Sequence, residues 1–430
     1  MATAPEEAPD LTAAAGAAQV EVPPELVAQT FGEYARAYVV RIRNGQSGVL
    51  PVVVGLVAIM VVFEVISPNH VFLSAGNLVN LMAQSSFIIT LGMAEVFVLL
   101  LGEIDLAAGF TAACGAVVAL WMLALGDPLW AAVLTALAAS AAYGALQGII
   151  IARLKLPSFV VTLAGQLGLS GVLLYLISAT GNIGVGGVIN LHNSVINDIE
   201  SGYLTPAATW IVMIVIAALA GAVIFYGDLR RRTAGLVAPP VSVTLLKVAG
   251  IVIAAVVIAW VANINRGRLI VLEGLPWGVL VVLAILFIWT VLLGRTRFGR
   301  YLYAIGGNAE AARRAGINIV RVRTLAFMLC GLTAGATGII YASYLGSIST
   351  GVDGGQNVLY AIAAAVIGGT SLFGGRGKML HAVLGGLVVG VIYNGLELLG
   401  LSAAAQLMWT ALVLLAAVIV DRITRAGSAR

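Results

Sequence analysis

Two acidic residues stand close together in a part of the chain that is otherwise apolar. Glu103 and Asp105 lie in LLLGEIDLAAG, residues 99–109, between two hydrophobic runs that are each long enough to cross a membrane. A carboxylate at the centre of a span costs roughly 2.5–3.5 kcal/mol on insertion scales, so such acids usually face a cavity or a partner. The pair therefore predicts a helix break that lines an internal polar passage. Glu95, eight residues before Glu103 and on nearly the same helical face, is the third candidate for this passage.

A second polar stretch, later in the chain, is strongly basic. Residues 295–323 read RTRFGRYLYAIGGNAEAARRAGINIVRVR and hold seven arginines against a single acid, Glu310. Apolar runs of span length flank this stretch on both sides. An excess of Lys and Arg in a loop between spans marks the cytoplasmic side of a membrane, so we expect a cytoplasmic loop at 295–323.

This loop is expected to contain one short helix. Asn308 is a good N-cap, residues 309–315 are mostly strong helix formers, and Gly316 stands where a C′ glycine would end the helix. Two turns are marginal alone in water, because so few residues do not recover the cost of nucleation. Either the loop's own packing or a partner's groove must hold the helix, and the small side chains of Ala311 and Ala312 would permit close docking. The alternative is a solvated loop that is helical without a role.

The other residue types that carry chemistry are few and scattered. His70, His192 and His381 are far apart, with no Cys or carboxylate cluster at ligand spacing, so we expect no metal site. Cys114 and Cys330 both lie within apolar runs, which argues against a disulfide framework and a zinc site. We expect no cofactor on this chain.

Composition places the chain in a membrane. Of its 430 residues 61% are hydrophobic and only 10% are charged, which excludes a soluble globular domain. A net charge of +4 would suggest nucleic acid in a soluble protein, but here the basic residues fall in loops between spans. Membrane lipid is therefore the expected surrounding, and nucleic acid is not an expected partner.

The apolar runs predict an all-α, polytopic membrane protein of about twelve transmembrane helices. Residues 1–25 predict a disordered cytoplasmic tail, because they are rich in Ala, Pro and acids. Residues 26–46 predict an amphipathic helix at the membrane interface, and residues 47–430 form the transmembrane domain. The expected spans are about 48–67, 78–101, 107–125, 129–151, 158–178, 208–227, 244–262, 277–294, 324–345, 357–372, 379–400 and 406–421.

Small residues recur at four-residue spacing within several spans. In lipid, where Leu gains nothing by leaving the solvent, such faces let helices approach closely. They predict ordinary helix packing at Gly144 and Gly148, Gly331 and Gly335, and Gly386 and Gly390.

Basic residues alternate between the loops and so predict the topology. The loop at 179–207 has no Lys or Arg, as an external loop should, and Arg266 and Arg268 are the exception that this count leaves outside. The count also allows Glu103 and Asp105 to sit in a short cytoplasmic turn, although two acids without a base would break the pattern. Both termini are expected in the cytoplasm, on the side that carries Arg153 and Lys155, Arg230 to Arg232, the loop 295–323, Arg376 and Lys378, and Arg422, Arg425 and Arg430.

Five motifs carry a resemblance to a known family. They are GEIDL at 102–106, LPSFVVTLAG at 156–165, AIGGNAEAARRAGIN at 304–318, AIAAAVIGGTSLFGG at 361–375 and NGLELLG at 394–400. In this order and spacing, over about residues 75–422, they resemble the permease subunits of bacterial sugar ATP-binding cassette importers, the ribose and xylose permeases. Within that family the chain looks most like the xylose permeases, because it contains GEID, LPSF followed by VTLAG, and an extra segment near 228–270.

The resemblance implies a fold, a function and partners. The fold would resemble the vitamin B12 importer type with added helices, in the bacterial inner membrane. The chain would be a transport subunit rather than an enzyme, form a homodimer or pseudodimer, and pass a pentose such as D-xylose. A separate ATPase subunit would bind ATP, and a periplasmic or lipid-anchored sugar-binding protein would deliver the solute. The ATPase would dock on a coupling helix in the loop that holds Gly307, Asn308, Glu310, Ala311, Ala312 and Gly316.

Departures from the family pattern and rival functions stay open. Ala107 and Ala108 stand where the family often has Ser-Val, and Tyr360 stands where an acid commonly precedes AIAA. An importer of this type could also carry a hexose, an autoinducer or a branched-chain amino acid. An ion-coupled secondary transporter would suit many spans and a few buried acids, although the sequence has no inverted repeat.

Overall fold

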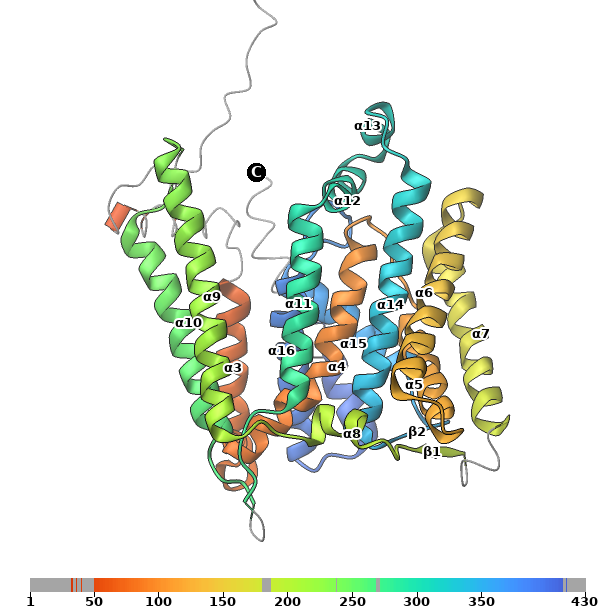
Figure 1. Cartoon of the computed structure of the whole chain (residues 1–430), viewed down its shortest axis with the longest axis horizontal. Coiled ribbons are helices and arrows are strands. Elements are labelled where there is room, and N and C mark those ends of the chain that lie inside the picture. The colour runs from red at the N-terminus through yellow and green to blue at the C-terminus, as the bar shows by residue number, and fades with distance from the viewer. Residues whose placement is uncertain are drawn as a thin grey trace, which may run out of the picture.

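The computed structural model of the chain describes residues 50–179, 187–236, 238–267 and 271–412, together with residues 32, 33, 36, 40 and 415. These residues form a bundle of helices with one pair of short strands (Figure 1). The predicted tail at 1–25 and most of the predicted interfacial helix at 26–46 lie outside the described residues, so both stay predictions.

Eleven of the twelve predicted spans coincide with helices of the described part. Residues 403–412, within and just before the last predicted span, are helical as well. Eight of the described helices are long and apolar enough to cross a membrane, and α3, α5 and α15 are shorter apolar helices. The all-α, polytopic fold is confirmed by α3 (Leu50–Ile66), α4 (Ala75–Leu99), α5 (Ala108–Ala124), α6 (Leu129–Leu154), α7 (Ser158–Ala179), α9 (Pro206–Thr233), α10 (Val241–Ala262), α11 (Trp277–Arg295), α14 (Ile319–Leu345), α15 (Gly354–Gly368) and α16 (Met379–Leu398).

Polar side chains cap the starts of α4 and α14, and a glycine ends α14. The Ser74 hydroxyl accepts a hydrogen bond from the Asn77 N–H at the start of α4, and the Asn318 side chain accepts one from the Arg321 N–H at the start of α14. Each cap satisfies an N–H group that the helix leaves without a partner. Gly346, at a φ of 67°, ends α14 in the left-handed region that favours glycine.

The centre of the bundle is α4. In the most apolar stretch of α4, 94% of the residues are buried, compared with 67% in the same stretch of α14 and of α16. It contacts α14, α16, α15 and α11, while α5 and α6 pack on α14. The segment near 228–270, which contains α10, pairs with α9 as a hairpin at the edge of the bundle (Figure 1).

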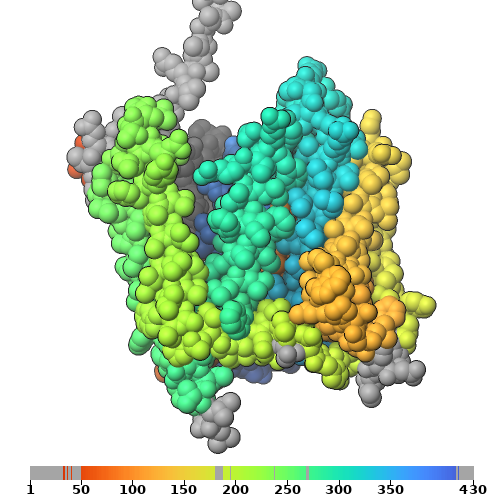
Figure 2. Space-filling view, in the orientation of Figure 1, coloured from red at the N-terminus to blue at the C-terminus, as the bar shows by residue number. Residues whose placement is uncertain are grey.

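The two ends of the bundle differ. At one end lie α12 (Arg297–Gly307), which packs on the bundle, and α13 (Ala309–Arg314), which projects from it (Figures 1 and 2). At the other end lie α8 (Ser194–Ser201) and a two-stranded antiparallel ladder of β1 (Val188–Asn190) and β2 (Ser347–Ser349), with Ile189 opposite Ile348. The ladder and α12 were not predicted from the sequence.

Arg266, one of the two exceptions to the basic-loop pattern, lies at the α8 end with its charge satisfied locally. Its guanidinium carbon stands 5.1 Å from the centre of the Tyr203 ring, and its Nη2 donates to the Gly274 carbonyl at 3.0 Å. A cation over an aromatic face is stabilised without a negative lipid surface. Its position therefore needs no change in the predicted topology.

The predicted close packing at the glycine pairs is confirmed. A Cβ added at Gly144 of α6 would overlap the Phe327 carbonyl of α14, and one at Gly148 would lie 2.8 Å from the Thr324 Cα. At Gly386 of α16 an added Cβ would lie 2.6 Å from the Ile89 side chain of α4. Helices can approach to this distance only without side chains in between.

We therefore expect Gly144→Ala to lower the stability of the purified protein by about 1–3 kcal/mol, because the methyl group forces α6 and α14 apart. Gly168→Ala in α7 is the matched control, since an added Cβ there meets nothing within 4 Å. Thermal unfolding in one detergent measures both variants, and equal melting temperatures would refute the packing argument.

Candidate functional site

A glycine turn ends α4 and creates the break that holds the acidic pair. The Glu103 N–H donates to the Val98 carbonyl at 3.1 Å, and the Gly102 N–H donates to the Leu99 carbonyl at 2.9 Å. Gly102 has a φ of 75°. These nested bonds form a Schellman motif, in which the left-handed residue is usually glycine. The GEID motif is thus the C-terminal cap of α4.

Glu103 forms an ion pair with α14. Its carboxylate lies 2.8 Å from the Nε of Arg323, and the two side chains are 9% and 27% exposed respectively. Arg323 stands near the start of α14, shortly after α13. Burial raises the pKa of the Glu103 carboxyl above its ordinary value, and the Arg323 charge opposes that shift. The pair joins the break in α4 to the helix that follows the basic loop.

Asp105 lies deeper in the bundle and is 1% exposed. Its Oδ1 accepts a hydrogen bond from the Ala107 N–H at 3.0 Å, and the Cys330 thiol of α14 donates to its Oδ2 at 3.6 Å. The first bond is an Asx-turn just before α5, so Asp105 supports the start of that helix. Glu95 of α4 is fully buried next to Asp105.

The structure thus brings Glu95 and Asp105 together, while Glu103 turns toward Arg323. Both residues of the predicted pair are buried, with Glu103 at 7% and Asp105 at 1% exposure. A solvated turn would expose them, so their burial favours the internal location. Among the described residues, no group of three His, Cys, Asp or Glu side chains could hold a metal ion.

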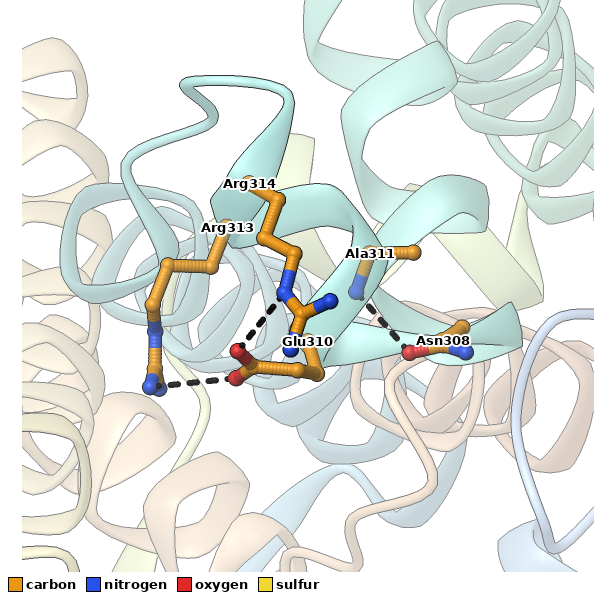
Figure 3. Close-up of polar contacts among 5 residues, drawn as sticks. All are labelled: Asn308, Glu310, Ala311, Arg313 and Arg314. Carbon is orange, nitrogen blue, oxygen red and sulfur yellow. Dashed lines mark hydrogen bonds and ion pairs between the residues drawn. The ribbon is translucent and has the colours of Figure 1, made fainter. Parts of the chain in front are cut away.

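The short helix of the basic loop is α13, and Figure 3 shows its N-cap and ion pairs. The Asn308 Oδ1 accepts from the Ala311 N–H at 2.9 Å, as predicted for an N-cap. Glu310 accepts from Arg313 and Arg314, both at 3.3 Å, but such exposed pairs each stabilise a helix by only about 0.3–0.5 kcal/mol. Gly316, at a φ of 81°, follows the helix as expected for C′.

Most of α13 is exposed, but one side chain anchors it. Ala312 is 5% exposed and belongs to the same apolar core as Leu302 and Ile305 of α12. The chain's own packing therefore holds this short helix, which removes the need for a partner to keep it folded. Ala311, by contrast, is exposed. Of the two small residues expected to allow docking, Ala311 faces outward and Ala312 faces the chain itself.

Three chain segments meet backbone to backbone beside the break. The Gly375 N–H donates to the Leu100 carbonyl at 2.9 Å, and the Tyr303 hydroxyl donates to the Gly377 carbonyl at 2.8 Å. An added Cβ at Gly306 would overlap the Leu100 carbonyl, so α12 can lie here only because this residue is glycine. Arg323, Cys330 and Gly306 were not predicted as parts of the site, although the glycines of three motifs were a signal for close backbone approach.

Comparison with known proteins gives the family. Residues 77–184 and 165–420 match the model of a family described as branched-chain amino acid transport system permease components. The xylose transport system permease protein XylH of Escherichia coli is 34% identical over 386 residues, covering 88% of this chain and 93% of that protein.

Two further relatives cover nearly as much. The ribose import permease protein RbsC of Escherichia coli is 30% identical, over 86% of this chain and 92% of the relative. The D-allose transport system permease protein AlsC of the same organism is 29% identical, over 86% and 90%. No solved structure matches the chain. Because the family model and these relatives extend over most of its length, the chain belongs to this family of transport-system permeases, the membrane subunits of ATP-binding cassette importers.

Proposed function

We propose that this chain is the permease subunit of an importer that moves a monosaccharide, D-xylose, across the bacterial inner membrane. The single observation that carries the proposal is α13, a capped helix that projects from the bundle with its outer face free of the chain's own packing. A membrane bundle that is driven by a separate ATPase needs such a surface outside the bilayer. D-xylose is the proposed solute because the xylose relatives are 32–34% identical to the chain, against 30% for the ribose permease and 29% for the allose permease.

The proposed orientation places the α13 end in the cytoplasm. The last turns of α6 and α9 are basic and lie on the same side as α13 in Figure 1. They hold Arg153 and Arg230 to Arg232 respectively. Lys and Arg gather on the cytoplasmic side of membrane proteins. Both termini would then be cytoplasmic, and the α8 end would receive the sugar-binding protein.

We further propose that the exposed face of α13 docks on the ATPase subunit. Glu310, Ala311, Arg313 and Arg314 all have exposed side chains, while Ala312 anchors the helix to the core. Gly307, Asn308 and Gly316 shape the two ends of α13. Because α13 is anchored to the core and joined to α14 by a short connection, a displacement of α13 by the ATPase would also displace α14. A homodimer would provide two such helices, one for each ATPase.

Glu95, Glu103 and Asp105 are proposed to line the path of the solute. Carboxylates buried among apolar helices are costly, and in transporters such residues mark substrate pathways. A sugar has no charge but carries many hydroxyl groups. Carboxylate oxygens accept hydrogen bonds from such hydroxyl groups.

The direct test of this function is uptake by proteoliposomes that hold the permease, its ATPase and the binding protein. We expect D-xylose to accumulate only when ATP is present on the α13 side. Uptake driven by a proton or sodium gradient without ATP would establish the secondary-transporter alternative. Accumulation of a branched-chain amino acid in place of sugar would keep the importer and change the solute.

The docking of α13 is tested by Ala311→Trp. Because Ala311 is exposed, the variant should fold and insert normally, but the indole would block a partner's groove. ATP-driven uptake should fall at least about tenfold, which corresponds to ~1.4 kcal/mol of lost docking free energy. Ala234→Trp, on an exposed residue just after α9 at the same end, is the control. Undiminished uptake by Ala311→Trp would show that this face of α13 contacts no ATPase.

The passage role of Asp105 is tested against its role in the turn before α5. Asp105→Asn keeps an oxygen for the Ala107 N–H and removes the charge, whereas Asp105→Ala removes both and should cost about 1 kcal/mol of stability. We expect the Asn variant to melt like the natural protein yet to transport more slowly. Asp127→Asn, in the exposed turn between α5 and α6, should change neither property. Normal uptake by Asp105→Asn, with lowered stability only in Asp105→Ala, would leave Asp105 a purely structural residue.

A further inference from the structure

Aromatic side chains gather at the α8 end of the bundle, where α4, α14 and α16 meet. The ring of Phe87 lies 4.5 Å from that of Tyr341 and 6.4 Å from that of Tyr344, measured between centroids. Tyr393 of α16 is close to Tyr341 and stands edge-on to Tyr360 of α15 at 6.1 Å. Two polar side chains complete the group, which we call the aromatic cluster: Gln84, Phe87, Tyr341, Tyr344, Tyr393 and Glu397.

Glu397 stands at an unfavourable position for an acidic residue. It is the second-last residue of α16, and the negative end of the helix dipole disfavours an acid there. Its Oε2 accepts a hydrogen bond from the Gln84 amide at 2.7 Å, and none of the ion pairs among the described residues involves it. Gln84 is 1% exposed whereas Glu397 is exposed, so a buried amide orients a carboxylate at the surface of the bundle. Packing alone gives no reason for this arrangement.

A small pocket continues inward from the cluster. Phe87 and Tyr341 form part of its wall, and Leu91, Thr337 and Asn357 line it further. Along α4, Gln84, Phe87, Leu91 and Glu95 recur every three or four residues and therefore share one face of the helix. That face leads from the exposed Glu397 to the buried acids beside the helix break.

The chemistry of the cluster suits a monosaccharide. A sugar ring has apolar C–H faces and a rim of hydroxyl groups. Half-buried aromatic rings bury such a face, and tyrosine hydroxyls, an amide and a carboxylate offer hydrogen bonds to the rim. A carboxylate bond to a hydroxyl is also stronger than a neutral one. The same set would give an inorganic ion or a purely apolar solute no comparable fit.

We propose that the aromatic cluster is a sugar-contact site of the permease itself, where the monosaccharide rests after release from the binding protein and before it moves along α4. This proposal rests on the proposed function and adds to it that the membrane subunit, too, recognises the sugar. Glu397 accepts bonds from the hydroxyls, Gln84 orients Glu397, and the rings of Tyr344 and Tyr393 cover the apolar face.

The test uses the permease with its ATPase and binding protein in proteoliposomes. Glu397→Gln keeps the size of the side chain and an oxygen for the Gln84 amide but removes the charge. We expect D-xylose uptake to fall at least about tenfold, the loss typical for a charge-assisted hydrogen bond to a ligand. ATP hydrolysis stimulated by the loaded binding protein, and the melting temperature, should stay unchanged. Tyr175→Phe, on a tyrosine 71% exposed on α7, is the matched control.

A second measurement detects the contact itself. Saturation-transfer NMR of D-xylose with the purified permease–ATPase complex should give a signal that Glu397→Gln loses and Tyr175→Phe keeps. Uptake by Glu397→Gln equal to that of the natural protein, or a loss matched by a fall in melting temperature, would overturn the sugar-contact site. Failure of the natural protein to take up D-xylose would instead refute the proposed function, so the two failures are distinguishable.

Discussion

The ion pair between Glu103 and Arg323 is the contact on which both parts of the candidate site depend. Taking a carboxylate out of water costs several kcal/mol, and removing the partner of a buried charge costs about 3–5 kcal/mol. Arg323 therefore allows α4 to end in an acidic break inside an apolar bundle. Because Arg323 also stands near the start of α14, shortly after α13, the compensating charge lies on the element that a docked ATPase would move. Under the proposed function, this one contact would link the docking of the ATPase to the path of the solute.

Close backbone packing fixes the surroundings of that contact. The C-terminal cap of α4 at Gly102, the helix α12 at Gly306 and the loop before α16 at Gly375 approach one another without side chains in between. A Cβ at Gly102 would lie 3.1 Å from the Phe373 carbonyl, and φ at Gly102 is already in the left-handed region. The glycines of GEID, IGGN and LFGG, which lie far apart in the chain, thus have one shared physical role. They hold the break, α12 and the loop at 371–377 as a unit.

The sequence predicted what depends on short-range regularities. Hydropathy located the spans, because a length of apolar residues is sufficient to define one, and Asn308 and Gly316 marked the ends of α13 because caps act within a few residues. Contacts between distant segments could not be predicted. Nothing local pairs Glu103 with Arg323, aims Ala312 inward and Ala311 outward, or places Glu397 beside Gln84. The helix α12 was missed although Phe298, Leu302 and Ile305 recur at helical spacing, because the segment is short, basic and rich in glycine, a poor helix former.

A double-mutant cycle tests most directly whether the ion pair links the docking of the ATPase to the passage of the solute. ATP-driven uptake is measured for Glu103→Gln, Arg323→Gln and the double variant in the same proteoliposomes. Each single variant leaves one charge without its partner, whereas the double variant leaves none. The account predicts that both single variants lose uptake and that the double variant transports better than the product of their losses. Losses that simply multiply would contradict it, because the two residues would then act independently.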